Sequence, residues 1–368
     1  MTQVINGVDW SDLEHKWSIN VYQLDPADMS SMWGRLEGVD LSTCSISEGY
    51  YTDTRVQGQL SYYDAERNRQ AFIQIRATVP NVHTEILGTF LVTNDDVSYE
   101  GGSLKTTLNL ESMLYALDVQ AMKAPWVVKK GTSFSTFANQ ILNTCHRPWR
   151  NCSMRGYTYG SAVSYSTGTS YLSALYDACS TSNNRLDVDG RGNVTIEPYI
   201  LPKKRTPIFN INLNDVTGIA HDGVTRSSDY LELPTDCVVY YNRDSDNVTD
   251  CVRGYASNGG RYSFGQRGYV VTKVVSVSEE PKGGATALAN KAKTLLANAS
   301  VENVTWEVTT EYMPVHAGDV GYLQGMTLDI SPYNTRQLVM VKNVELELEH
   351  MTMKLTLKSA NSNDEEEE

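Results

Sequence analysis

The candidate metal ligands of the chain are three residues in one short segment. Cys145 and His146 are adjacent, and Cys152 follows them closely. Zinc in proteins takes four ligands, commonly as two short-spaced pairs, and the next cysteine, Cys179, falls within a predicted helix. The sequence therefore favours three ordinary residues at a helix end and in a loop over a zinc site.

Two acidic segments carry the residue types of a calcium site. One runs from Asp187 to Asn193, and the other holds Asp244, Asp246 and Asp250. An EF-hand loop needs oxygen ligands over about twelve residues and a closing bidentate Glu, and Glu197 falls at the wrong offset for that role. Hairpin turns use Gly and Asn at positive φ, so both segments are predicted to be turns.

Catalytic motifs are missing from the sequence. It has no G-x-x-x-x-G-K-[ST] phosphate loop, no G-x-S-x-G elbow and no H-E-x-x-H metal helix. The six histidines stand singly, at positions 15, 83, 146, 221, 316 and 350. Because a nucleophile needs a base within hydrogen-bond reach, the sequence assigns no catalytic, cofactor-binding or metal-binding residue. We therefore expect a protein without a cofactor that is not an enzyme.

Tyrosine is the most frequent aromatic residue, with 22 copies against 6 Phe and 6 Trp. Four of them, Tyr157, Tyr159, Tyr165 and Tyr171, lie in or beside the segment 146–168. A tyrosine-rich loop suits recognition, because a rigid ring with a polar tip gives contact area at low entropic cost. The alternative is that Tyr replaces Phe on half-exposed β faces, and both interpretations stay open.

Charge and hydropathy restrict the classes of partner. The chain of 368 residues has 31 Lys and Arg against 44 Asp and Glu, a net charge of −13, and its last five residues are all acidic. Specific nucleic-acid binding needs a cluster of excess basic residues, so none is expected. A membrane span needs about 20 consecutive apolar residues, and neither such a run nor a signal peptide at the N-terminus is found. We expect reduced thiols and synthesis in the cytoplasm.

The first 120 residues are predicted to be mostly strands. Alternating apolar residues, the pattern of a half-buried strand, occur in residues 17–21, 36–46 and 71–77. A hairpin follows, with residues 87–92 on one strand, Gly101 and Gly102 at the turn, and Leu104, Thr106, Leu108 and Leu110 on one face of the return strand. A short helix over residues 111–117 closes a first β-barrel domain, 1–120.

Residues 121–200 change period and predict a small α+β insert domain. Phe134, Phe137, Ala138, Ile141 and Leu142 form the stripe of an amphipathic helix, capped by Thr132 or Ser133. A second helix carries Leu172, Leu175, Tyr176 and Cys179 after a Thr169 or Ser170 cap. Residues 145–167 between them are predicted to be a loop. A hairpin pairs residues 185–188 with 194–196.

Residues 201–358 are predicted to form a second β-barrel domain with one helix, 285–299, followed by an acidic disordered tail, 359–368. Strands are expected at 208–212, 236–242 and 304–309. At the C-terminus, Leu338, Met340, Val344, Leu346 and Leu348 share an even phase, whereas Met351, Met353, Leu355 and Leu357 share an odd one. Since a one-residue slip moves side chains to the other face, the chain must turn near residues 349–351.

This order of elements resembles the phage tail hub family, the baseplate hub or late control protein D-like proteins of long-tailed phages. Three local patterns carry the resemblance. Residues 87–93 followed by 104–117 are similar to the family's "G-x-F-x-V" strand, and Gly131-Thr132-Ser133 opens a segment similar to its insert domain. Residues 312–320, ending in Gly318-Asp319-Val320, resemble its "P-x-x-x-G-D-x-V" corner.

The resemblance implies a mainly β fold in which two tail-tube-like barrel domains flank a small helical and hairpin domain. It also implies a trimeric ring at the distal end of the tail tube, in the virion. Such a ring would join the tube and the distal tail protein to tip, fibre or tape-measure proteins, and would let DNA pass. Two alternatives remain: a tail-associated hydrolase of cell wall or capsule, and an adhesin whose loop 146–168 binds a surface glycan.

Overall fold

The computed structural model describes residues 4–5, 8–10, 17–79, 83–145, 149–151, 154–215, 219–221, 223–229, 231, 233–242, 251–259, 262–277, 283–299, 303–325 and 336–360. The chain divides into two compact units, residues 1–223 with 307–357, and residues 224–306 with 358–368. In the described ranges, no helix combines the length and apolar character that a membrane crossing requires.

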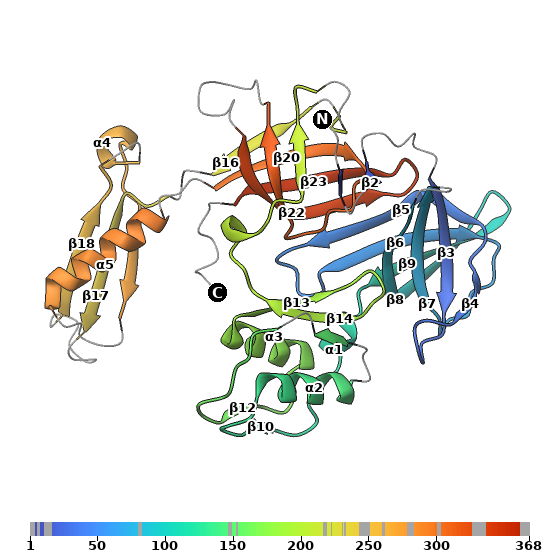
Figure 1. Ribbon diagram of the computed structural model, residues 1–368, viewed down its shortest axis with the longest axis horizontal. Helices are drawn as coiled ribbons and strands as arrows, with labels where there is room; N and C mark the ends of the chain where they lie inside the picture. Colours follow the sequence, from blue (N-terminus) through green and yellow to red (C-terminus); the bar gives the residue numbers. More distant parts are fainter. Residues whose placement is uncertain are drawn as a thin grey trace. The chain divides into compact units, whose positions relative to one another are not determined.

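One large sheet dominates the first unit (Figure 1). Its strand order is β20-β23-β22-β5-β6-β9-β8-β7-β3-β4, with β21 paired to β22 and β15 paired to β21. The strands are β3 (Ser18–Leu24), β4 (Met32–Arg35), β5 (Val39–Gly49), β6 (Val56–Tyr63), β7 (Phe72–Val79), β8 (His83–Glu100), β9 (Ser103–Glu111), β15 (Phe209–Asn212), β20 (Asn303–Glu311), β21 (Val320–Gln324), β22 (Gln337–Glu347) and β23 (Thr352–Ser359). The short pair β1 (Val4–Ile5) and β2 (Val8–Asp9) stands apart from this sheet.

The two ends of the chain share this sheet through the pairing of β22 with β5. The strands run antiparallel, with Val344 opposite Glu48 and Leu346 opposite Ile46. Ile46 and Leu346 are 2% and 5% exposed, and burying an aliphatic side chain contributes about 1.5–3 kcal/mol. Sequence patterning could not assign this register, because the paired residues lie some 300 positions apart.

The predicted hairpins of the first unit are confirmed. β8 and β9 pair across Gly101 and Gly102, which adopt φ of 60° and 96°. β22 and β23 turn where the apolar phase changes, and Met351 takes a φ of 51° there. The predicted helix at 111–117 is shorter and later than expected, since α1 spans Tyr115–Asp118.

The insert packs two helices around one apolar core. α2 (Phe134–Thr144) is capped by Ser133, whose hydroxyl accepts from the Thr136 N–H at 3.2 Å, and α3 (Tyr171–Ser182) by Ser170. The α2 stripe is buried as predicted. The hairpin β13 (Asn184–Val188) and β14 (Val194–Pro198) completes the insert, and the 3-10 turn η1 (Pro202–Lys204) follows it.

The segment between the two helices was predicted to be a loop, and that prediction is wrong in two places. β11 (Trp149–Asn151) pairs parallel with β14, and β12 (Val163–Tyr165) pairs antiparallel with β10 (Trp126–Val128). Three-residue strands are too short to establish a period-2 pattern. Tertiary pairing with strands already in place therefore determines their conformation.

The second unit holds β16 (Thr225–Asp229) and a three-stranded sheet with one covering helix. The sheet order is β18 (Cys251–Ser257), β17 (Asp236–Asn242) and β19 (Thr272–Ser276), and the helices are α4 (Phe264–Arg267) and α5 (Gly284–Ala299). Leu288, Ala292 and Leu296 of α5 pack on Cys237 and Val239. A Cβ at Gly254 would lie 2.1 Å from the Ala289 nitrogen, so glycine allows α5 to approach the sheet closely.

The predicted fold class, mainly β with an α+β insert, is confirmed. No closed barrel is found among the strands that the structure describes, because the strand order of the large sheet has separate ends.

Candidate functional site

The corner at residues 312–320 is held by its own polar groups. The Asp319 carboxylate accepts from the His316 N–H at 2.8 Å, and the Asp319 N–H donates to the His316 carbonyl at 3.0 Å. Gly318 has a φ of 96° and donates its N–H to the Val341 carbonyl of β22 at 2.7 Å. A Cβ on Gly318 would lie 2.7 Å from the ring of Tyr50 and from the Arg185 guanidinium. Glycine is therefore required there for both φ and space.

Glu48 of β5 also binds the corner, through its carboxylate. Its carboxylate accepts from His316 Nδ1 at 3.0 Å and from the Ala317 N–H at 3.1 Å. Burial raises the pKa of Glu48, but the His316 charge and these hydrogen bonds outweigh burial and hold the pKa below its usual value. The same carboxylate raises the pKa of His316. At neutral pH this contact is thus an ion pair.

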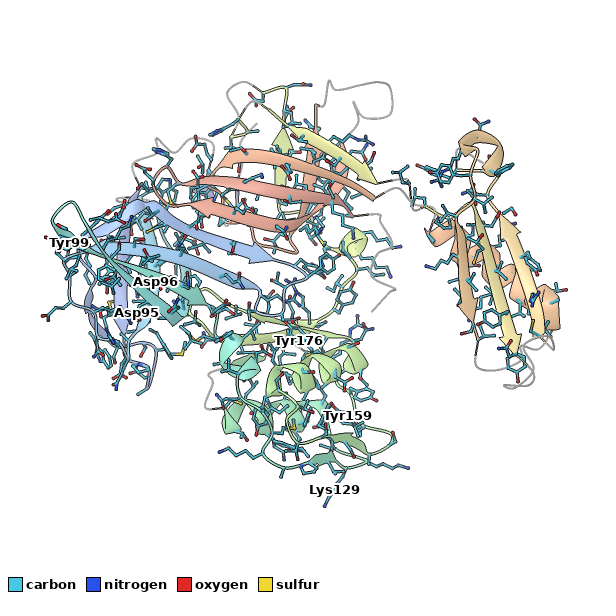
Figure 2. All side chains as sticks on the ribbon, turned by 180° about the vertical axis from the view of Figure 1, so that it is seen from behind. Asp95, Asp96, Tyr99, Lys129, Tyr159 and Tyr176 are labelled. Atoms are coloured by element: carbon cyan, nitrogen blue, oxygen red, sulfur yellow. The ribbon has the colours of Figure 1, made fainter. Side chains whose placement is uncertain are left out.

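Three arginines surround the ring of Tyr50 beside the corner. The guanidinium carbons of Arg185, Arg205 and Arg55 lie 4.7, 5.5 and 5.7 Å from the ring centroid. Cation–π contacts of this kind contribute about 0.5–2 kcal/mol each. Arg55 also lies 5.4 Å from the ring of Tyr176, which is labelled in Figure 2. These arginines come from the β5–β6 turn, the insert and the segment after it.

Arg185 and Arg205 also donate hydrogen bonds to the corner. Arg185 Nη2 donates to the Ala317 carbonyl at 3.0 Å and to Asp187 at 2.5 Å, and its Nη1 lies 3.8 Å from Glu197. Arg205 donates to the Gly318 carbonyl and to the Tyr50 hydroxyl. Side chains therefore connect the corner to β5 and to the insert, and the Gly318 N–H connects it to β22. We call this cluster of side chains the junction: Glu48, Tyr50, Arg55, Arg185, Arg205 and His316.

The tip of the insert hairpin contacts the first strands of the sheet as well. Thr89 of β8 donates its hydroxyl to the Gly190 carbonyl at 2.9 Å and accepts from Gln74 Nε2 at 2.8 Å. Gln74 in turn accepts from Arg76 Nε at 2.6 Å. This chain of hydrogen bonds fixes the insert to β8 and β7, independently of the junction.

A cavity of about 280 Å³ lies between the junction and the insert hairpin. Its charged lining includes Glu48, Arg55, Arg185, Asp187 and His316. The Glu48 and Asp187 carboxylates each accept from a cation within 3.0 Å. General acid–base catalysis needs a group free to exchange a proton with a substrate, whereas these groups bind one another.

Two of the candidate metal ligands considered from the sequence lie in the described part of the chain, and both are buried thiols. Cys145 and Cys179 are each 2% exposed, and burial raises the pKa of Cys179 to about 12, which keeps it a thiol. His146 and Cys152 lie outside the described residues. No three His, Cys, Asp or Glu side chains among those described are grouped as a metal ion would need.

The segment from Asp187 to Asn193 is a hairpin turn, as predicted. The Asp189 carboxylate accepts from the Arg191 N–H, the Asn193 N–H and Asn193 Nδ2 at 2.8–3.1 Å. Gly192 has positive φ, as expected for such a turn, whereas Asn193 does not; the Asn193 side chain and backbone both bind Asp189. Asp244, Asp246 and Asp250 lie outside the described residues.

The tyrosines of the insert pack in its core. Tyr159 and Tyr165 are 3% and 8% exposed, and Tyr157 and Tyr171 are packed against the same cluster. The Tyr165 ring stacks on Phe137 at 5.6 Å, and its hydroxyl donates to Asp177 at 2.8 Å. Figure 2 shows Tyr159 within the insert. The rings of Tyr159 and Tyr165 are therefore not a free surface for a glycan.

Sequence reasoning did not find the junction. The contacts that bring its parts together join residues far apart in sequence, such as Arg205 with Gly318 (113 positions) and Glu48 with His316 (268 positions). The one available signal was the corner pattern, whose glycine and aspartate the structure explains.

Solved structures of tail proteins share this fold over nearly the whole chain. The tail protein from Neisseria meningitidis MC58 has a TM-score of 0.62 at 11% identity, covering 94% of this chain and 97% of that one. The 43 kDa tail protein of prophage MuSo2 from Shewanella oneidensis has a TM-score of 0.62 at 8% identity, covering 94% and 99%. Prophage tail protein gp18 from Listeria monocytogenes EGD-e has a TM-score of 0.52 at 10% identity, covering 92% and 94%.

The chain therefore has the fold of phage and prophage tail proteins, as the resemblance predicted. No family model matches it, and no curated protein matches its sequence. The shared property is the fold, since sequence identity is about a tenth.

Proposed function

We propose that the chain is a structural phage tail hub protein. Three copies form a ring at the distal end of the tail tube, which joins the tube and the distal tail protein to tip, fibre or tape-measure proteins and lets DNA pass. The observation that carries this proposal is the match to tail proteins along almost the full length of both chains. The protein would act in the virion after assembly in the host cytoplasm.

The junction supports a mechanical role. A hub must keep its parts in register while the tail bears load, and the junction ties β5, the insert and the corner at residues 312–320 together through charged and cation–π contacts. Its charged groups bind one another, which stiffens the fold and leaves them unavailable to a substrate. This arrangement fits a passive conduit.

The acidic balance supports the passage of DNA. The net charge is −13, and like charges repel phosphates, so an acidic channel wall would let DNA slide without adhering. The alternative of a glycan-binding loop loses its main support, because Tyr159 and Tyr165 are buried in the insert core. The hydrolase alternative has less support, because the Glu48 and Asp187 carboxylates that line the cavity each accept from a cation.

Electron microscopy of the purified protein tests the proposal. Two-dimensional class averages should show closed rings with threefold symmetry and a central channel. Single 41.0 kDa particles or open filaments at every concentration would contradict it. Mixing with a distal tail protein from the same phage should produce a stacked two-ring particle.

A further inference from the structure

Arg55 differs from the other charged residues of the cavity wall, because no acid among the described residues pairs with it. None of those residues accepts a hydrogen bond from its guanidinium, and its Nε is buried without a partner. Its side-chain contacts are the rings of Tyr50 and Tyr176, at 5.7 and 5.4 Å. An arginine carries several N–H donors and no acceptor, so this guanidinium retains donors for a group from outside the chain.

The acids of the cavity wall are bound elsewhere: Glu48, Asp187, Asp189 and Glu197. Glu48 accepts from His316 Nδ1 at 3.0 Å, and Asp187 accepts from Arg185 Nη2 at 2.5 Å. Asp189 accepts within its own hairpin turn, and Glu197 lies 3.8 Å from Arg185. A ligand that brings a negative charge to Arg55 would therefore displace none of these contacts.

A hydroxyl on the facing wall of the cavity has no partner either. Thr195 of β14 lies opposite Asp187 of β13 in the hairpin register, and directly opposed residues of an antiparallel pair share a face. Both residues line the cavity. Thr195 is 8% exposed, and its hydroxyl makes no hydrogen bond to any residue that the structure describes. The cavity thus has two polar groups without partners, one on each wall.

The backbone holds Arg55 at the cavity in a strained conformation. Its φ is 62°, in the left-handed region that costs free energy for residues other than Gly, Asn and Asp. The Arg55 N–H donates to the Thr52 carbonyl at 3.2 Å, and the Arg55 carbonyl accepts from the Gly49 N–H at 2.8 Å. Strained residues of this kind concentrate at functional sites, so the strain is a second observation that points to a use for this side chain.

The remaining wall of the cavity restricts the ligand. Val56 and Leu87 add apolar surface, and the volume of about 280 Å³ is at the small end of the range for ligand pockets, about 300–1,000 Å³. A carboxylate suits the polar part, because its two oxygens accept charge-assisted hydrogen bonds from a guanidinium and a hydroxyl. A doubly charged anion would be repelled more strongly by the acids of the wall. The features favour a single carboxylate on a short aliphatic stem.

We propose that the cavity binds a carboxylate with a short aliphatic stem, held by Arg55 and Thr195. The carboxylate oxygens accept from the Arg55 guanidinium and the Thr195 hydroxyl, and the stem lies against Val56 and Leu87. Two sources share this chemistry: a free aliphatic acid, and a glutamate side chain of a neighbouring protein. Carboxylate binding does not require the trimeric ring of the hub proposal, so either can fail while the other stands.

Saturation-transfer NMR with butyrate as the probe, at constant ionic strength, tests the site on the full chain. The wild type should bind butyrate saturably, and should bind the uncharged isostere butyramide at least about tenfold more weakly. Arg55→Gln should weaken butyrate binding at least about tenfold, and Thr195→Val about threefold or more. The matched control Arg35→Gln alters an arginine with a 52% exposed side chain outside the cavity wall, and it should bind like the wild type.

Arg55→Gly keeps the test decisive if Arg55→Gln folds poorly. Glycine adopts a φ of 62° without strain, so this variant removes the guanidinium while the turn is preserved. It should lose butyrate binding as fully as Arg55→Gln does. Butyrate binding that is unchanged in either variant, or butyramide binding equal to that of butyrate, would overturn the proposal.

The peptide acetyl-Gly-Glu-Gly-amide distinguishes the two sources of the carboxylate. Arg55-dependent binding of the peptide at least as tight as that of butyrate would support a glutamate of a neighbouring protein. Arg55-dependent binding of butyrate alone would support a free acid. A wild type that binds neither probe saturably would overturn carboxylate binding, and would leave the ring to be judged by its own experiment.

Discussion

The hairpins β8–β9 and β22–β23 both alternate apolar residues along their strands, yet they bury them differently. In β22–β23, Leu346, Leu348, Met351 and Leu355 are all at most 5% exposed up to and through the turn. In β8–β9, burial is complete at Leu108 and is lost by Leu104 and Tyr99. The alternation of apolar residues in the sequence indicates on which face of a strand a side chain lies. Whether that face is buried depends on the neighbouring strands.

The reason for the difference lies in what flanks each hairpin. β22 lies between β23 and β5, and the corner attaches to it through the Gly318 N–H. The outer half of β8 has β9 on one side and no described strand on the other. The first hairpin is thus part of the core of the unit, whereas the outer half of the second lies outside that core.

Leucine truncation in the two hairpins should give the largest contrast. Leu355→Ala removes a side chain that is 0% exposed, and we expect a loss of about 2–5 kcal/mol in the free energy of unfolding from lost burial and a cavity. Leu104→Ala, at a position 52% exposed, should cost less than about 1 kcal/mol in the monomer. Urea denaturation of both variants measures this, and equal losses would remove the distinction between the hairpins.

Substituting glycine should cost more stability at the corner, at Gly318, than at the tip of the β8–β9 hairpin, at Gly101. Gly318→Ala meets both a φ of 96° and contacts of 2.7 Å with Tyr50 and Arg185, so we expect a cost of about 2–3 kcal/mol. Gly101→Ala has a φ of 60° with open space around it and should cost about 1 kcal/mol. Thermal unfolding of the pair checks the order, and a more costly Gly101→Ala would contradict it.

The ion pair at the corner should give a small, pH-dependent effect. Glu48 raises the pKa of His316, so the folded protein holds this proton more tightly than the unfolded chain does. The resulting stability is complete below the unfolded pKa of about 6.5 and is lost as the pH rises through the higher folded value. Because the His316 side chain is 57% exposed, the effect should stay under about 1 kcal/mol.

Denaturation of wild type and His316→Gln at pH 6 and pH 10 measures this contribution. The two proteins should differ more at pH 6 than at pH 10. A difference that is constant, or that grows with pH, would show that the pair contributes nothing through its charge.

Local patterns in the sequence predicted most helices and strands, but they could not predict which of these elements contact one another. The stripe of α2 and the phase change near Met351 are confirmed, because they depend on residues a few positions apart. The junction and the β22–β5 register depend on pairs such as Glu48 with His316, which only the complete fold brings together. The buried positions of Tyr159 and Tyr165 were likewise undetermined, since tyrosine is compatible with both a core and a surface.

The most direct test of the hub assignment is the solution mass of the wild-type protein, measured by light scattering over a concentration series. We predict a mass that approaches three times the 41.0 kDa chain and then stays constant, because a closed ring has no free surface for a fourth copy. A mass equal to one chain at all concentrations, or one that grows without limit, would contradict it.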